Sequence, residues 1–88
     1  MNYAPVPIVM VFAGHDPCGG AGIQADIETL TSLGCHPCTI ITALTAQDTS
    51  TVKDFIPADA TFLVEQARAV LEDMPVAAFK IGMTASVE

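Results

Sequence analysis

Hydrophobic residues along the 88-residue chain form continuous runs that alternate with segments of helical spacing. Residues 6–13 (VPIVMVFA) are almost entirely apolar, which is typical of a strand that is buried on both faces. Residues 39–46 (TIITALTA) are rich in β-branched side chains and predict a second interior strand, and residues 76–83 predict a third. Runs of this kind favour a sheet whose two faces are both covered by helices.

Two helices are predicted between these strands. Within residues 23–33 the apolar positions recur at helical spacing, and Gly34 follows as a natural C-terminal stop. Asp59 is the expected N-cap of a second helix with one apolar side, which Pro75 ends. Residues 51–56 (TVKDFI) fit a short strand and an extended loop equally well. The alternation of strand and helix predicts one α/β unit with parallel strands.

Three polar or glycine-bearing segments follow the predicted strands. Crossover connections return each strand in the same direction, so these segments are expected to converge at one edge of the sheet, where open α/β sheets bind ligands. The segments are GHDPCGG (14–20), AQDTS (46–50) and KIGMT (80–84). The sequence therefore predicts a ligand site at this edge.

Asp26 is the first candidate residue for that site. At about 100° per residue, it falls inside the apolar stripe that begins at Ile23 and ends at Leu33. A buried carboxylate needs hydrogen-bond partners, and we expect these to be N–H groups of the glycine-rich loop and a small ligand that the loop holds. The alternative is a plain loop followed by an aspartate that only complements the helix dipole.

Gln47 is the second candidate, because its amide follows an apolar run at the same edge and offers both donors and acceptors to a heterocycle. Read more simply, it is an ordinary residue at a strand end. The glycine-rich loop has neither the G-x-x-x-x-G-K-[ST] nor the G-x-G-x-x-G pattern of nucleotide-binding loops. A compact neutral or polar small molecule therefore suits the loop better than nucleotide phosphates.

The remaining reactive side chains have simpler interpretations. Cys35 follows a predicted helix end, so the CHPC motif (35–38) lacks the helix N-terminus that redox cysteine pairs use. A zinc site would need His15 and Cys18, at one end of the first helix, to join the CHPC cysteines at the other end. We expect free thiols and a loop histidine. Lys80 is expected to pair with an acid or to extend from the sheet rather than to act as a catalytic amine.

Ten acidic residues oppose only three lysine and arginine residues, so the net charge is −7 and nucleic acid is disfavoured as a partner. The N-terminal apolar run is too short and wrongly flanked for a signal peptide or a membrane span, so we expect a cytoplasmic chain with no membrane partner. Hydrophobic residues make up 51% of the chain, and the mean hydropathy is +0.50. This is unusually apolar for a small domain, so we expect something further to cover its surface.

Three segments together resemble the hydroxymethylpyrimidine/phosphomethylpyrimidine kinase family of thiamine biosynthesis, within the ribokinase-like superfamily. They are AGHDPCGGAGIQADIET (13–29), ITALTAQDT (41–49) and FKIGM (79–83). Cys18 stands where serine is usual in that family, and His15 where threonine or histidine occurs. The resemblance implies a ribokinase-like, Rossmann-type three-layer α/β sandwich with a mostly parallel sheet. Residues 1–88 are expected to be the N-terminal part of a single kinase domain, without its ATP-binding part.

The resemblance also implies roles for individual residues. Gly14, Asp26 and Gln47 are expected to hydrogen-bond an aminopyrimidine substrate. Thr45 and Met83 are expected to line its pocket. In the family, the catalytic residue, the anion hole and most contacts with ATP and Mg²⁺ come from later sequence, so we expect no catalytic and no metal-binding residue in this chain.

The activity implied for the full-length protein is ATP-dependent phosphorylation of 4-amino-5-hydroxymethyl-2-methylpyrimidine and then of its monophosphate. The 88 residues alone are expected to be inactive, because they supply substrate orientation without the phosphoryl-transfer machinery. The full-length form is expected to be a homodimer. Two alternatives stay open, namely a pyridoxal or pyridoxine kinase and a non-catalytic pyrimidine-binding module.

Overall fold

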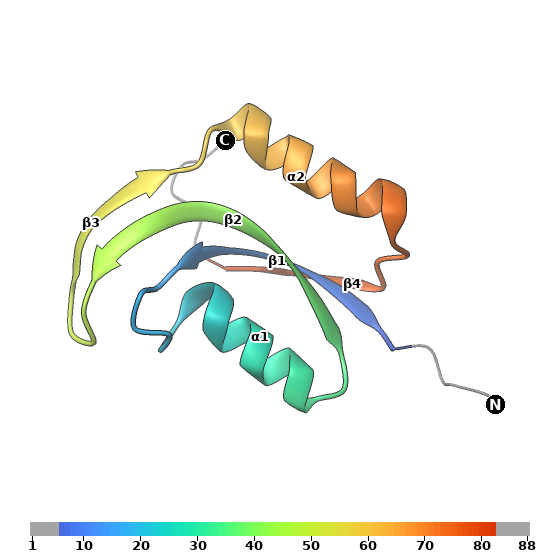
Figure 1. Ribbon diagram of the computed structural model, residues 1–88, viewed down its shortest axis with the longest axis horizontal. Helices are drawn as coiled ribbons and strands as arrows, with labels where there is room; N and C mark the ends of the chain where they lie inside the picture. The colour runs from blue at the N-terminus through green and yellow to red at the C-terminus, as the bar shows by residue number, and fades with distance from the viewer. Residues whose placement is uncertain (1–5, 83–88) are drawn as a thin grey trace.

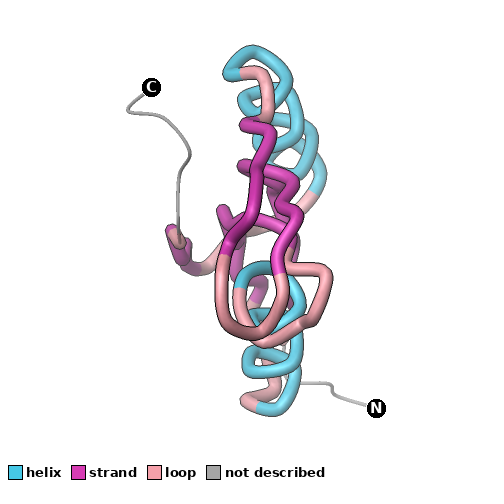
Figure 2. Tube along the Cα trace, turned by 90° about the vertical axis from the view of Figure 1, so that its left-hand side faces the viewer, coloured by secondary structure: helices cyan, strands magenta, loops and turns pink. Residues whose placement is uncertain are grey.

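A four-stranded sheet lies between two helices in the computed structural model, which describes residues 6–82 (Figure 1). The elements in chain order are β1 (Ile8–His15), α1 (Gly22–Ser32), β2 (His36–Gln47), β3 (Val52–Pro57), α2 (Ala60–Asp73) and β4 (Ala78–Ile81). The strand order is β3-β2-β1-β4, and α1 and α2 lie on opposite sides of the sheet, as the turned view in Figure 2 also shows. The predicted α/β class with three layers is confirmed.

One strand runs against the others. β1 is parallel to its neighbours β2 and β4, whereas β3 is antiparallel to β2. The undecided segment at residues 51–56 is thus largely a strand, and it runs antiparallel, whereas the three predicted strands are parallel as expected. A parallel return needs a crossover of about a dozen residues or more, and only residues 48–51 separate β2 from β3. The sheet is therefore mostly parallel, with one antiparallel edge strand.

Both helices begin and end close to their predicted bounds. Gly34 follows α1 with a φ of +81°, the left-handed conformation that glycine adopts most readily. The side chain of Asp59 caps α2 by accepting a hydrogen bond of 3.2 Å from the backbone N–H of Phe62. The predicted helix stop and N-cap are both confirmed. Neither α1 nor α2, the helices of residues 6–82, combines the length and apolar character that crossing a membrane requires.

β1 is buried on both of its faces. Alternate residues of this strand form a buried cluster with Ile23 of α1, namely Val9, Val11 and Ala13. On the other face, Met10 is fully buried and lies opposite Cys38 of β2 in the strand register. The Sγ atom of Cys38 is 3.5 Å from Sδ of Met74, the residue that follows α2. Because side chains alternate along a strand, this double burial explains why the run in β1 is apolar throughout.

The same alternation sets the direction of the side chains on the edge strand β4. Lys80 lies opposite Val11 in the parallel register, so it shares the face of Val11 and points toward α1. Phe79 and Ile81 point to the opposite face, where they are 58% and 68% exposed. All four residues of β4 are exposed, and α2 has no fully buried residue. The described chain therefore leaves apolar surface uncovered, as its composition predicts.

Candidate functional site

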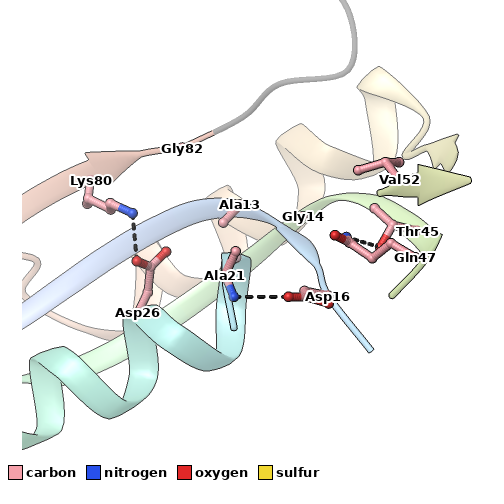
Figure 3. Close-up of a pocket in the computed structure, with 11 residues that line it drawn as sticks. Ala13, Gly14, Asp16, Ala21, Asp26, Thr45, Gln47, Val52, Lys80 and Gly82 are labelled. Carbon is pink, nitrogen blue, oxygen red and sulfur yellow. Dashed lines mark hydrogen bonds and ion pairs between the residues drawn. The ribbon is translucent and has the colours of Figure 1, made fainter. Parts of the chain in front are cut away.

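A cleft of about 340 Å³ opens at the carboxyl ends of β1 and β2 (Figure 3). Eleven residues line it. Most come from β1, β2, the glycine-rich loop and the start of α1, and the others come from β3, from β4 and from Gly82, which follows β4. The cleft is at the edge where α/β sheets bind ligands. Its volume is within the range of small-molecule sites. The predicted convergence of the strand ends is therefore confirmed.

Asp16 organises the glycine-rich loop between β1 and α1. Its carboxylate accepts hydrogen bonds from the backbone N–H groups of Cys18 at 2.9 Å and of Gly20 and Ala21 at 3.0 Å, and the residue is only 6% exposed. The sequence predicts that the N–H groups of this loop donate hydrogen bonds to Asp26. This is wrong for these three N–H groups, which donate to Asp16. An aspartate readily binds the N–H groups that follow it in a turn. The Asp-Pro start of the loop was the signal for this role.

Gly22 allows the first turn of α1 to approach the end of β1. Its φ is +65°, and a Cβ atom at this position would lie 2.2 Å from the backbone oxygen of Gly14. No side chain fits at such a distance, so the contact between helix and strand requires a glycine here. This close approach brings the start of α1 to the edge of the cleft.

Asp26 faces the cleft from the second turn of α1 (Figure 3). Its side chain is 13% exposed, which confirms the prediction that it lies within the apolar stripe. Oδ1 forms an ion pair of 2.6 Å with Nζ of Lys80. Oδ2 is buried and has no hydrogen-bond partner among residues 6–82. An unpaired buried oxygen is unfavourable, so Oδ2 is an acceptor whose hydrogen-bonding capacity is unused by residues 6–82.

Thr45 and Gln47 form the other end of the cleft (Figure 3). The Thr45 hydroxyl donates a hydrogen bond to the backbone oxygen of His15, and it accepts one of 2.6 Å from Nε2 of Gln47. These bonds turn the amide nitrogen of Gln47 toward Thr45. The amide oxygen, Oε1, therefore stays available as an acceptor. Side chains from α1 and from β2 thus meet at one cleft.

Four of the five predicted site residues line this cleft, namely Gly14, Asp26, Thr45 and Gln47. The fifth, Met83, lies outside the described residues. The contacts of these residues with a substrate stay a prediction. Asp16 was missed by the sequence analysis. For Lys80, the expected pairing with an acid is confirmed.

Among the described residues that line the cleft there is no cysteine and no histidine. The three cysteines are free thiols, with Cys18 exposed, Cys35 half-buried and Cys38 buried. Cys18 lies near the cleft, because its Sγ is 3.8 Å from the backbone oxygen of Gln47. Across residues 6–82, no three His, Cys, Asp or Glu side chains gather where they could hold a metal ion.

Asp48 begins the turn between β2 and β3, directly after Gln47. Its Oδ1 accepts hydrogen bonds from the backbone N–H groups of Ser50 at 2.8 Å and Thr51 at 2.9 Å. These backbone hydrogen bonds, first that of Ser50 and then that of Thr51, lower the pKa of the Asp48 carboxyl below its usual 3.8. The carboxylate therefore stabilises the turn that leads to Val52, which lines the cleft.

Comparison with known sequences shows that this chain is similar to kinases. Residues 16–88 match the model of a protein family described as phosphomethylpyrimidine kinase. The hydroxymethylpyrimidine/phosphomethylpyrimidine kinase of Mycobacterium leprae is 44% identical to the chain, over 98% of the chain and 33% of that protein. The protein of the same name from Escherichia coli K12 is 42% identical, over 90% of the chain and 30% of that protein. The chain thus spans about a third of the length of these curated relatives.

Comparison with solved structures gives the same fold. A phosphomethylpyrimidine kinase from Clostridium difficile 630 has a TM-score of 0.84 and 42% sequence identity, over 90% of this chain and 36% of that chain. A pyridoxal kinase from Bacillus subtilis, solved as an ADP complex, also has a TM-score of 0.84, over 94% of this chain and 33% of that chain. Its sequence identity is 29%. The fold therefore does not separate the two kinases, whereas sequence identity favours the first.

Proposed function

Because the chain belongs to the phosphomethylpyrimidine kinase family, we propose that it forms the pyrimidine-binding side of a hydroxymethylpyrimidine/phosphomethylpyrimidine kinase. The complete enzyme transfers phosphoryl groups from ATP to 4-amino-5-hydroxymethyl-2-methylpyrimidine and then to its monophosphate, in thiamine biosynthesis. The observation that carries the proposal is the cleft in which Asp26 offers a buried, unpaired carboxylate oxygen.

In this proposal the pyrimidine ring lies between Asp26 and Gln47. Oδ2 of Asp26 accepts a hydrogen bond from the exocyclic amino group, because a buried charged oxygen without a partner gains most from a donor. Gln47 and the backbone of Gly14 bind the other polar positions of the ring. Thr45 and Met83 line its sides.

The charges around the cleft support a neutral ring as the substrate. The Asp16 carboxylate is satisfied by three backbone N–H groups, and that of Asp26 is paired with Lys80. Among residues 6–82, no further cation lines the cleft, so nothing there compensates the charge of a triphosphate. A flat neutral heterocycle held by a few hydrogen bonds fits a cleft of this kind.

Kinase activity implies a nucleotide substrate, and we propose ATP with Mg²⁺. The described residues do not fit a metal–nucleotide site, since no metal-ligating cluster forms among residues 6–82 and no lysine follows the glycines of the loop. As the family resemblance implies, we propose that phosphoryl transfer is carried out by parts of the enzyme outside this chain. The contribution of this chain is orientation, because a ring that is held in place presents its hydroxymethyl group in one direction.

Residues 1–88 are proposed to be the N-terminal part of one ribokinase-like kinase domain. The chain spans about a third of the length of its relatives, and the exposed Phe79 and Ile81 leave an apolar face that further chain can cover. The family resemblance further supports a cytoplasmic homodimer as the complete enzyme.

The test is a kinase assay on the natural polypeptide that carries these residues, with the hydroxymethylpyrimidine and pyridoxal as competing substrates. We expect ATP-dependent phosphorylation, with kcat/KM for the pyrimidine at least about tenfold higher than for pyridoxal. A preference for pyridoxal would make the protein a pyridoxal kinase. Binding of the pyrimidine without turnover would make it a non-catalytic binding module.

Asp26→Ala tests the binding mode in the same polypeptide. We expect KM for the pyrimidine to rise by about ten- to a hundredfold, or turnover to vanish, while the thermal unfolding transition is retained. The matched control is Asp54→Ala on β3, because the exposed Asp54 accepts a hydrogen bond from the neighbouring N–H of Phe55 and lies outside the cleft lining. Unchanged kinetics in Asp26→Ala would remove Asp26 from the site.

A further inference from the structure

Lys80 occupies one of the two carboxylate oxygens of Asp26. Its Nζ lies 2.6 Å from Oδ1, while Oδ2 is buried and has no partner among residues 6–82 (Figure 3). An open carboxylate accepts a forked pair of donors, as it does from an arginine side chain. With Oδ1 paired to Lys80, Oδ2 is the only oxygen of Asp26 that has no partner among residues 6–82.

The position of β4 beside β1 brings Lys80 within reach of Asp26, while the Lys80 side chain itself is 52% exposed. Lys80 shares the α1-facing side of the sheet with Val11, its partner in the register, and reaches the second turn of α1 from there. The Asp26 side chain is only 13% exposed, so water compensates its charge poorly and the ammonium group is its nearby counter-charge. Removal of that ammonium would leave a charge at the cleft without compensation.

Lys80 is also the one cationic residue among the described residues that line the cleft. The other charged lining residue besides Asp26 is Asp16, whose carboxylate is turned to the backbone N–H groups of its own loop. The pair of Asp26 and Lys80 is formally neutral, so the charge of Asp26 is compensated before a ligand binds. A cationic ligand meets the ammonium group and finds only one oxygen of Asp26 without a partner among the described residues.

We propose that Lys80 is a specificity-determining residue, which makes the cleft accept neutral rings with a single donor toward Asp26 and reject cationic rings with two. The inference rests on the proposed function, because it concerns the pyrimidine site. It assigns Lys80 no part in phosphoryl transfer. Without Lys80, Asp26 would present two open oxygens and a full charge, which is the arrangement that a flat amidinium group matches.

The test compares two probes by calorimetry in the natural polypeptide. One is the neutral hydroxymethylpyrimidine, and the other is benzamidine, a flat cation with two N–H donors on one side. In Lys80→Met, we expect the ratio of benzamidine affinity to pyrimidine affinity to rise by at least about tenfold, with a gain for benzamidine itself. A merely structural role for Lys80 lowers both affinities together, because a loosened cleft binds neither ring better.

Lys53→Met is the matched control, because Nζ of Lys53 also pairs with an aspartate, Oδ2 of Asp48, at 3.6 Å, but at the exposed start of β3 and outside the cleft lining. It should leave the ratio unchanged. Adding Asp26→Asn to Lys80→Met should abolish the gain for benzamidine. If Lys80→Met does not fold, Lys80→Gln keeps a donor for Oδ1 without the charge and should change the ratio in the same direction. An unchanged ratio, or a parallel loss of both affinities, overturns the proposal.

The two proposals fail in different ways. If the unmodified protein does not bind the pyrimidine, the proposed function fails, while the benzamidine affinity of Lys80→Met relative to the unmodified protein still tests Lys80. If the pyrimidine binds and benzamidine does not gain affinity in Lys80→Met, the selectivity role fails and the proposed function stands.

Discussion

Asp16 and Asp26 have different structural roles, and only one of these roles follows from a periodic pattern. The burial of Asp26 is predictable, because helical spacing puts it among apolar residues. Its partner is not predictable in this way, since Lys80 is 54 positions away and meets it only because β4 lies beside β1. The role of Asp16 comes from local turn chemistry, which a search for buried periodic positions passes over.

Gly22 gives a prediction at the scale of one residue. Gly22→Ala forces a side chain into a φ of +65° and places its Cβ 2.2 Å from the backbone oxygen of Gly14. We expect the free energy of unfolding to fall by about 3 kcal/mol or more, measured by urea denaturation. Gly34→Ala is the control, because Gly34 also has a positive φ, of +81°, but a Cβ atom there would have no other atom within 4 Å. It should lose only about 1 kcal/mol from backbone strain. Equal losses would show that contact with β1 is not what requires glycine at position 22.

At the scale of elements, the hydrophobic pattern predicts what is buried and periodic. It finds α1 and α2 because each has an apolar side and a recognisable end, at Gly34 and at Asp59. It finds β1 because both of its faces are buried. It does not show whether residues 51–56 form a strand or a loop. All six residues of β3 are exposed, so neither face of the strand requires an alternation of polar and apolar residues. The short connection at residues 48–51 fixes the antiparallel direction of β3.

The turn before β3 gives a prediction about pH. Hydrogen bonds from Ser50 and Thr51 hold the pKa of Asp48 below 3.8. Above pH 3.8 the ionised carboxylate therefore makes its full contribution to the stability of the turn. The contribution is lost as pH falls through the lower folded pKa. In an NMR titration, the backbone N–H signals of Ser50 and Thr51 should therefore shift together with the Asp48 carboxyl, at a midpoint below 3.8.

Asp48→Asn is the control for this titration, because it keeps an acceptor oxygen for the two N–H groups and has no proton to gain. The coupled shifts of Ser50 and Thr51 should vanish in this variant. A midpoint at or above 3.8 in the unmodified chain would contradict the role given to these hydrogen bonds.

At the scale of the whole molecule, the general location of the site is predictable and its detailed pairing is not. Parallel strands bring their carboxyl ends to one edge, so the meeting of Gly14, Asp26 and Gln47 follows from the α/β alternation. The order β3-β2-β1-β4 does not follow from the periodic pattern. It puts β4 beside β1 and thereby brings Lys80 to Asp26. The charge balance of the cleft is therefore a property of the assembled sheet rather than of any one segment.

The exposed face of β4 provides a prediction for the complete enzyme. Ile81 is 68% exposed, so Ile81→Ser in the 88-residue chain should change the free energy of unfolding by less than about 0.5 kcal/mol. If further chain packs on this face, as proposed for a complete kinase domain, the same change in a polypeptide of the family's full length removes a buried side chain. It should then cost about 2 kcal/mol or more. Denaturant titrations of the two polypeptides measure both values. Small losses in both would contradict the covered face, since a side chain that stays in contact with water has little packing to lose.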